Sequence, residues 1–549
     1  MNVNDAVARI LKLENVEWVA CYPSNHLIES VAREGIRPVM FRQERAAVMA
    51  ADGYSRLNKR EKFGVVISQG AAGSENAMGG IAQAFSDNIP ILYLPGGDAG
   101  SKLDQYAVRP NFSPVRTYQS VSKYGEVIVQ ADQATDVMRR AFHHLRNGRP
   151  GPVIVEIPAD ISVSEVPEQT SDYHSPKRHR QLPATDDIKD AVRLLLGAQR
   201  PMIWSGMGVL LSDATEELKA LAELTGIPVY TTTSGKSSFD ERHPLALGAG
   251  SRATTLAART WLDQSDVLFA VGSSMTQSIY NQSFPSDKII IHNTETSDDI
   301  NKDFAVDCGI PGDVRLTLKA VIEEVKTQIG TGGRQEHKSV VDEIAQLRNR
   351  WMAEWTDILN SDEVPITTYR VIGELERHLD KENSIVTHDA GAPRDTIVPF
   401  YTATVPHSYI GWGKSTHLGY GIPLMIGAKL ARPEKFCLNF MGDGAFGMSG
   451  LDLETSVRIG APITTIVLNN GGMATYPRGY EIAREKFNVT HMTGDYAKIA
   501  EGLGAVGITV TQPGEVAHAI KQAQQLNAEG KTVLLDIHTN LEARRSRFD

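Results

Sequence analysis

The stretch "FMGDGAFG" places Asp443 between Gly442 and Gly444 and fits the spacing G-x-G-x-x-G. That spacing is typical of a loop that binds a dinucleotide, where a bare pyrophosphate comes close to the backbone. The carboxylate of Asp443 would repel that pyrophosphate. The run "ITTIVLNN" ends in Asn469 and Asn470, 27 residues after Asp443. A dinucleotide site needs an acidic residue at this second strand end, so the asparagines point to other chemistry.

A carboxylate and a carboxamide at neighbouring strand ends are instead suited to a cation. Mg²⁺ prefers hard oxygen ligands and commonly joins one or two carboxylates to substrate phosphates. Such an ion would neutralise Asp443, and a diphosphate could then reach the backbone N–H groups of Gly444 and Ala445. The alternative is that Asp443 caps the following helix and Asn470 makes a turn. Because the two residues occur together beside glycines, we favour the metal–diphosphate interpretation.

Short β-branched runs alternate with amphipathic segments along the chain, which predicts parallel sheets with crossover helices. At 549 residues the chain is too long for one core. We therefore predict an α/β protein with three doubly wound parallel-sheet domains. The expected division is a first domain at 1–165, a linker at 166–187, a middle domain at 188–330, a linker helix at 331–364 and a last domain at 365–549. The runs that predict buried strands are "FGVVIS", "IPILYLPG", "GPVIVEIP", "PMIWSG", "IPVYTT", "VLFAVGSS", "KIIIHN", "SIVTHDAG", "KFCLNFMGDG", "ITTIVLNNGG" and "TVLLDIHT".

The composition is ordinary for a soluble enzyme, and the formal net charge of −10 argues against nucleic acid or a membrane surface as partner. The N-terminal segment is amphipathic rather than a signal peptide, and no apolar run approaches the length of a membrane span. The three cysteines lie far apart, which disfavours zinc sites and disulfides and predicts a cytoplasmic protein. We expect the charged C-terminal run "LEARRSRFD" to be frayed or to lie on a neighbouring subunit.

The chain resembles the thiamine diphosphate enzymes of the acetolactate synthase, pyruvate decarboxylase and benzoylformate decarboxylase superfamily, and in overall look it most resembles acetolactate synthase. The resemblance rests first on G-D-G followed by N-N at the spacing given above, and it covers nearly the whole chain. Other matching runs are "FRQERAAVMAADGYSR", "QGAAGSENAMGGIAQAFSDNIPILYLPGG", "NGRPGPVIVEIPADI" and "LTGIPV". It implies a pyrimidine-binding first domain, a middle domain, and a last domain that binds diphosphate and Mg²⁺.

By motif position, the resemblance implies that Asp443, the side chain of Asn470 and the backbone carbonyl of Gly472 ligate Mg²⁺. "GAPRD" replaces the run that usually touches the diphosphate, and Arg394 is predicted to supply a charge-assisted contact there. Met473, in "GGMATYPRG", is predicted to lie beside the cofactor at the mouth of the pocket, or to be a packing residue.

The resemblance also implies that Glu44 bonds the pyrimidine nitrogen N1′ and promotes the tautomer that deprotonates the thiazolium carbon. The alternative for Glu44 is a helix-start carboxylate that interacts with the helix dipole. The carbonyl of Thr416 would receive the pyrimidine amino group, and Leu418 would wedge between the two rings. Without the family, Leu418 would simply be a core leucine.

Several departures from the family fall at substrate-facing positions. Ser24 is predicted to bind a carboxylate, and His26 to donate a proton, although a lone histidine is more often an ordinary surface or core residue. Gln69 stands where benzoylformate decarboxylase carries a catalytic histidine, which counts against a simple aromatic decarboxylase. The predicted substrate residues are Ser24, Asn25, His26, Gln69, Phe112 and Tyr476.

The resemblance implies a thiamine diphosphate- and Mg²⁺-dependent lyase or carboligase that decarboxylates a 2-oxo acid to an enamine and then forms a carbon–carbon bond. The alternatives are a non-ligating 2-oxo acid decarboxylase, a 2-hydroxyacyl-CoA lyase, a flavin- or NAD-dependent oxidoreductase, and a non-catalytic relative. The expected partner is a 2-oxo acid or aldehyde. Because the family's cofactor lies between subunits, a homodimer is the minimum and a homotetramer is expected. The middle domain could hold FAD, or ADP and coenzyme A, but we expect it to be empty.

Overall fold

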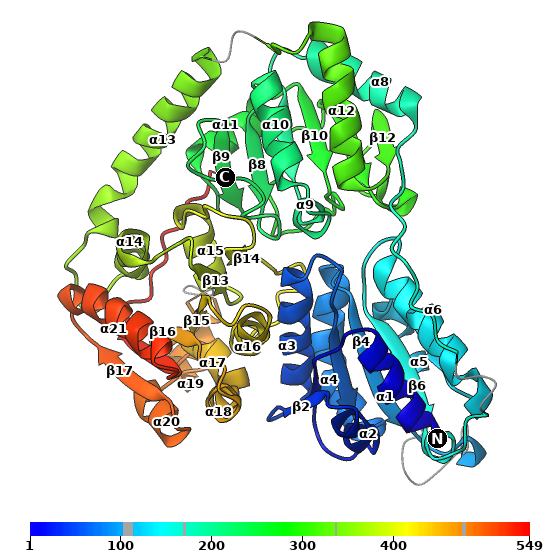
Figure 1. Cartoon of the computed structure of the whole chain (residues 1–549). Helices are drawn as coiled ribbons and strands as arrows, with labels where there is room; N and C mark the ends of the chain where they lie inside the picture. Colours follow the sequence, from blue (N-terminus) through cyan, green and yellow to red (C-terminus); the bar gives the residue numbers. More distant parts are fainter. Residues whose placement is uncertain (103–112, 168–171, 335–337, 475–478, 549) are drawn as a thin grey trace. The chain divides into compact units, whose positions relative to one another are not determined.

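The computed structural model describes residues 1–102, 113–167, 172–334, 338–474 and 479–548. Within these residues the chain forms three six-stranded sheets surrounded by helices, and their strands pair in parallel (Figure 1). The predicted α/β class with three doubly wound parallel sheets is confirmed. No helix of the described residues is long and apolar enough to cross a membrane.

The first sheet has the strand order β2-β1-β3-β4-β6-β5. Its strands are β1 (Trp18–Cys21), β2 (Arg37–Met40), β3 (Gly64–Ser68), β4 (Ile91–Gly97), β5 (Tyr124–Val127) and β6 (Val153–Pro158). Its helices are α1 (Val3–Leu13), α2 (Leu27–Arg33), α3 (Glu44–Leu57), α4 (Ala71–Ser86), α5 (Pro114–Thr117), α6 (Ala134–Arg146) and α7 (Ala159–Ser162). The strands β1, β3 and β6 are buried at every residue, as a parallel sheet covered on both faces requires.

The second sheet has the order β12-β11-β10-β7-β8-β9. Its strands are β7 (Met202–Ser205), β8 (Val229–Thr232), β9 (Ala246–Gly250), β10 (Val267–Val271), β11 (Ile289–Thr294) and β12 (Cys308–Pro311). Its helices are α8 (Thr185–Gly197), α9 (Gly208–Leu211), α10 (Thr215–Thr225), α11 (Leu256–Gln264) and α12 (Val314–Ile329), and the long helix α13 (Lys338–Leu359) follows them.

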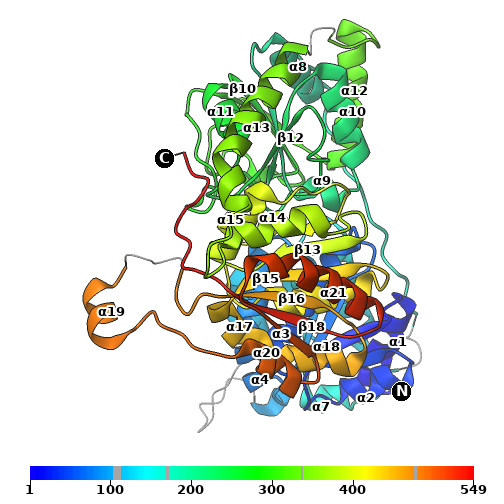
Figure 2. The ribbon, with the colours of Figure 1, turned by 90° about the vertical axis from the view of Figure 1, so that its left-hand side faces the viewer.

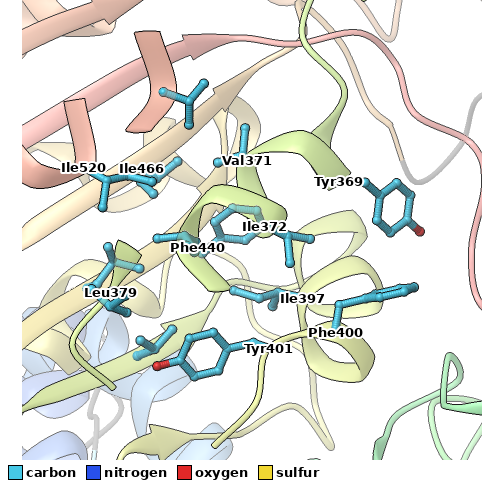
Figure 3. Packing of buried hydrophobic residues seen from close by; sticks show 14 of the residues in the cluster. Tyr369, Val371, Ile372, Leu379, Ile397, Phe400, Tyr401, Phe440, Ile466 and Ile520 are labelled. Carbon is cyan, nitrogen blue, oxygen red and sulfur yellow. The ribbon is translucent and has the colours of Figure 1, made fainter. Parts of the chain in front are cut away.

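The third sheet has the order β14-β13-β15-β16-β18-β17. Its strands are β13 (Ser384–His388), β14 (Tyr409–Ile410), β15 (Phe436–Gly442), β16 (Thr464–Asn469), β17 (Val506–Val510) and β18 (Val533–His538). The helices in this part of the sequence are α14 (Thr368–His378), α15 (Ala392–Phe400), α16 (Gly421–Ala431), α17 (Asp443–Ser449), α18 (Leu453–Ile459), α19 (Glu481–Phe487), α20 (Tyr496–Gly502) and α21 (Val516–Ala528). Apolar side chains of β15 and β16 meet those of α14, α15 and α21 in its core (Figure 3).

The chain divides into two compact units. The first unit comprises Met1–His179, Lys414–Pro433 and Ser449–Ala461, and the second comprises Arg180–Gly413, Glu434–Met448 and Pro462–Asp549. The helices α16 and α18 therefore belong to the first unit, although their sequence positions fall within residues 365–549. The contiguous domain bounds given above stay a prediction.

The C-terminal run packs against its own chain, so the expectation that it is frayed was wrong (Figure 2). Ser546 is buried, donates its hydroxyl to the Thr254 carbonyl and accepts the indole N–H of Trp351 at 2.9 Å. The guanidinium of Arg544 lies over the ring of Trp355, 4.3 Å from its centroid. A charged run can be held firmly when its aliphatic stems and backbone find buried partners.

Candidate functional site

Glu44 is the first residue of α3 and follows the edge strand β2. Its side chain is buried, with 3% exposed, and its Oε2 accepts the Asn76 amide of α4 at 3.1 Å. A Cβ atom at Gly73 would lie 3.2 Å from the Oε1 of Glu44, so glycine leaves room beside the carboxylate. The position at the helix start also suits the dipole interpretation. A buried carboxyl group of this kind can share a proton with a ring nitrogen.

The predicted substrate residues of the first unit gather at one edge of the first sheet. Ser24, Asn25 and His26 follow β1, and Gln69 follows the neighbouring strand β3. Asn25 is engaged in the fold, because its amide donates to the Ser68 carbonyl at 2.8 Å and its Oδ1 accepts the Leu27 N–H. Ser24, His26 and Gln69 are exposed, so they are the side chains of this group available to a ligand.

The loop of residues 414–420 carries Thr416 and Leu418 and belongs to the first unit. Thr416 has a φ of 54°, in the left-handed region that β-branched residues rarely adopt. Leu418 is half-buried rather than part of the closed core. The roles of Thr416 and Leu418 toward a cofactor stay predictions.

In the second unit, Asp443 joins two loops at neighbouring strand ends. Its Oδ1 accepts the Gly444 N–H at 2.7 Å after β15, and its Oδ2 accepts the Gly471 N–H at 3.0 Å after β16. Burial raises the pKa of Asp443, while the N–H groups of Gly444 and Gly471 oppose the shift. No salt bridge to Asp443 occurs among the described residues. A buried carboxylate without a cationic side chain suits a bound cation.

Asn470 makes the turn that the alternative interpretation predicts, because its Oδ1 accepts the Gly472 N–H at 3.0 Å. A carboxamide oxygen has two lone pairs, so this turn leaves one for a cation. Met473 lies beside the loop of Gly444, since a Cβ there would be 3.7 Å from its sulfur and 3.3 Å from the sulfur of Met492. The predicted residues Asp443, Gly444, Asn470, Gly472 and Met473 thus come together, and Ala445 follows them in α17.

The predicted donor set is one carboxylate, one carboxamide and one carbonyl. The described residues contain no group of three His, Cys, Asp or Glu side chains that could hold a metal ion. A site with a single carboxylate falls outside that description, and it suits Mg²⁺, which keeps several ligands from water and phosphate. The residues present therefore fit a magnesium–diphosphate group.

Arg394 lies in the first turn of α15, and its guanidinium is buried. Its Nε donates to Asp395 at 3.1 Å, and its Cζ lies 4.9 Å from the ring centroid of Tyr280. Asp395 also pairs with Arg547 of the C-terminal run at 2.7 Å. The start of α15 lies beside the end of β15, since a Cβ atom at Gly442 would lie 3.8 Å from the side chain of Pro393. A contact between Arg394 and a diphosphate stays a prediction.

Two predicted substrate residues, Phe112 and Tyr476, lie outside the described residues. The structure also reveals two residues of the site that the sequence did not indicate. Asn76 donates a hydrogen bond to Glu44, and Met492 lies beside Gly444. Asn76 sits within the Gly-rich run that marked the first domain, but only the fold shows that it faces Glu44. Met492 is distant in sequence and carries no local signal.

Three segments of the chain match families of known domains. Residues 1–116 match the domain described as thiamine pyrophosphate enzyme, N-terminal TPP binding domain. Residues 188–321 match the central domain of the same enzymes, and residues 389–537 match their C-terminal TPP binding domain. Together these segments contain both groups of residues described above.

Curated relatives align along most of the chain. A probable acetolactate synthase large subunit of Methanococcus aeolicus is 30% identical over 543 residues, which cover 95% of this chain and 90% of the relative. The acetolactate synthase large subunit of Corynebacterium glutamicum is 29% identical, with 90% and 79% covered. The acetolactate synthase isozyme 3 large subunit of Escherichia coli (strain K12) is 27% identical, with 97% and 94% covered.

Proposed function

Since this chain belongs to the thiamine pyrophosphate enzyme family, we propose that it is a Mg²⁺-dependent carboligase that decarboxylates a 2-oxo acid and joins the remaining carbon unit to a second carbonyl compound. When bound, thiamine diphosphate supplies the carbanion stabilisation that this chemistry requires. The acetolactate synthases among the relatives support ligation rather than simple decarboxylation.

The observation that carries this proposal is the arrangement around Asp443. Its buried carboxylate holds the Gly444 and Gly471 N–H groups, and the oxygen of Asn470 lies in the same turn. These residues would hold Mg²⁺ through the Asp443 carboxylate, the Asn470 carboxamide and the Gly472 carbonyl. The ion would neutralise a carboxylate that burial otherwise disfavours. Asp443 and Asn470 would thereby orient the diphosphate.

Glu44 would share a proton with the ring nitrogen N1′ of the bound pyrimidine. Its burial keeps water away from this proton, and the Asn76 amide fixes one carboxylate oxygen. General acid–base groups of this kind contribute about 10²–10⁴-fold to a rate. We therefore expect Glu44→Gln to lose about that factor in kcat while it still binds thiamine diphosphate.

The test incubates the protein with thiamine diphosphate, Mg²⁺ and pyruvate, and follows CO₂ and products by NMR. Acetolactate or acetoin, lost in Glu44→Gln, would support the carboligase. The matched control is Glu29→Gln, which alters an exposed carboxylate in the first turn of α2 and should keep full turnover. Equal losses in both variants would favour the dipole interpretation of Glu44.

Other outcomes would revise the proposal. Acetaldehyde as the sole product would indicate a non-ligating decarboxylase, and turnover only with a 2-hydroxyacyl-CoA would indicate the acyl-CoA lyase. Thiamine diphosphate binding without turnover would exclude pyruvate as donor but keep the cofactor site. Failure to bind thiamine diphosphate in the presence of Mg²⁺ would overturn the proposal.

We also propose a homodimer or homotetramer in the cytoplasm, with 2-oxo acids or aldehydes as partners. The three cysteines of the chain are free and buried, which suits a reducing compartment. For the middle domain we keep the proposal that it holds neither FAD nor ADP and coenzyme A. Flavin absorbance in the purified protein would contradict that proposal.

A further inference from the structure

The loop of residues 414–420 holds an unfavourable backbone conformation at the residue predicted to meet the cofactor. Thr416 is β-branched and has a φ of 54°. Such conformations persist only where the surroundings determine them, and they often mark functional positions. Some neighbouring group must therefore hold the residues on either side of Thr416.

Gln83 of α4 contacts both neighbours of Thr416. Its Oε1 accepts the Ser415 hydroxyl at 2.7 Å and the His417 backbone N–H at 3.2 Å. Gln83 has no exposed surface, so water cannot easily replace these bonds. A single side-chain oxygen thus fixes the backbone on both sides of the strained residue.

The orientation of the Gln83 amide is itself fixed. Its Nε2 donates at 2.9 Å to Asp87, the residue that caps the C-terminus of α4, which establishes which end of the amide faces the loop. Asp87 accepts Arg56 of α3 at 2.8 Å, and its other oxygen accepts the Lys414 N–H at 3.4 Å. The same carboxylate therefore orients Gln83 and holds the beginning of the loop.

The end of the loop is attached to the same network. Arg56 also pairs with Asp52, one turn earlier on α3, and Asp52 accepts the Tyr420 hydroxyl at 2.9 Å. Asp52, Arg56, Asp87 and Tyr420 are all buried. Buried polar networks of this kind are rigid when their members are satisfied.

We propose that Gln83 is a positioning residue for the cofactor: it holds the loop so that the Thr416 carbonyl and the Leu418 side chain meet the aminopyrimidine. It acts through the loop and does not touch the cofactor. The inference rests on the proposed function, because that function supplies the contact between this loop and thiamine diphosphate.

The test compares Gln83→Met with the unaltered protein by calorimetric titration with thiamine diphosphate and Mg²⁺, and by amide hydrogen exchange without cofactor. Losing the Gln83 bonds should weaken thiamine diphosphate binding about tenfold and speed exchange in residues 414–420 by a similar factor. Gln524→Met is the matched control: it loses the amide's bonds to the His378 and Ile520 carbonyls in the second unit, and it should leave both readouts unchanged.

Two further variants keep the test decisive if Gln83→Met does not fold. Ser415→Ala alters an exposed residue and removes one of the two bonds, so it should weaken binding by a smaller factor. Gln83→Glu keeps an oxygen that can accept from the loop, but it can donate to Asp87 only when it is protonated, and its ionised form would be repelled by Asp87, with Arg56 and Asp52 beyond it. The affinity of this variant for thiamine diphosphate, relative to that of the unaltered protein at the same pH, should therefore be near normal at about pH 5 and lower at about pH 8.

The outcomes separate this inference from the proposed function. If the unaltered protein binds no thiamine diphosphate, the proposed function fails. If it binds the cofactor and the Gln83 variants and Ser415→Ala bind it equally well, with unchanged exchange in the loop, the positioning role of Gln83 is wrong.

Discussion

Asp452 is a buried carboxylate of the first unit that the candidate site does not use. Its Oδ1 accepts the Arg42 N–H at 3.0 Å and the Thr455 hydroxyl at 2.9 Å, and its Oδ2 has no hydrogen-bond partner among the described residues. Burial raises the pKa of Asp452 to about 6, although the Arg42 N–H and the Thr455 hydroxyl oppose the shift. Between pH 3.8 and about 6, the folded protein therefore holds a proton on Asp452 that the unfolded chain releases.

This pKa sets a pH dependence of stability. The folded state binds more protons between the ordinary pKa of 3.8 and about 6, so the free energy of unfolding falls as pH rises through that window and is flat above it. Asp452→Asn keeps the acceptor oxygen and removes the titration. The free energy of unfolding, measured by urea titration, should rise in the variant relative to the unaltered protein by about 2–3 kcal/mol between about pH 4 and about pH 7.

The control for this measurement is Asp495→Asn, which changes an exposed N-cap carboxylate whose pKa is lowered by its hydrogen bonds to Lys498. Because the ordinary pKa of this carboxyl group is 3.8, it is ionised in both states above about pH 5, so the difference from the unaltered protein should stay constant from there upward. A constant difference for Asp452→Asn as well would show that Asp452 is ionised in the folded protein.

Single residues were predictable where their chemistry is visible in the sequence. Asp443 and Asn470 lie at the ends of neighbouring strands, and this was predictable because apolar runs followed by glycines mark those strand ends in the sequence. Asn25 was predicted to bind substrate but carries fold contacts, since an amide can satisfy backbone groups as readily as a ligand. Gln83 gave no signal, because its role depends on a loop more than 300 residues away in sequence.

At the scale of elements, α3 and α16 pack through a reciprocal pair of glycines. A Cβ at Gly427 of α16 would lie 1.9 Å from the Ala50 carbonyl oxygen, and a Cβ at Gly53 of α3 would lie 2.2 Å from that of Leu424. Both contacts are with backbone, which cannot move aside as a side chain can. The two helices thus approach as closely as only glycine permits.

We predict that Gly427→Ala destabilises the first unit by about 2–3 kcal/mol, because the added methyl group forces the two helices apart. The matched control is Gly197→Ala at the end of α8, where a Cβ meets nothing within 4 Å. That change should be neutral or stabilising by about 0.5–1 kcal/mol. Thermal unfolding of both variants is the measurement, and equal midpoints would contradict the close packing of α3 on α16.

The strands that the sequence failed to predict are mostly the edges of the sheets. Runs such as "VLFAVGSS" predicted central strands, here β10, because they are continuously apolar and β-branched. The edge strands β2, β5, β9, β12, β14 and β17 were missed, along with β1. An edge strand is half-covered and tolerates glycine, proline and charge, as in "ALGAG" of β9 and "CGIP" of β12.

At the scale of the whole molecule, the first and third sheets have the same strand order when strands are counted within each sheet. In both, the second strand is followed by a loop and a helix: Glu44 opens α3 after β2, and the loop of residues 414–420 precedes α16 after β14. The two predicted pyrimidine contacts therefore occupy equivalent places in two equivalent sheets. Only the strand order of the two sheets reveals this equivalence.

The proposed dimer makes one more testable claim: each active site would combine Glu44 of one subunit with Asp443 of another. Glu44→Gln and Asp443→Ala should each be inactive alone. If the subunits exchange, a mixed dimer of these variants has one doubly altered site and one unaltered site, so an equal mixture should recover about a quarter of the unaltered activity. The control is a mixture of the two variants under conditions in which their subunits do not exchange, and this mixture should show no recovered activity. If exchange is demonstrated by mass and activity is still absent, Glu44 and Asp443 serve the same site from one chain, and the shared-site dimer is wrong.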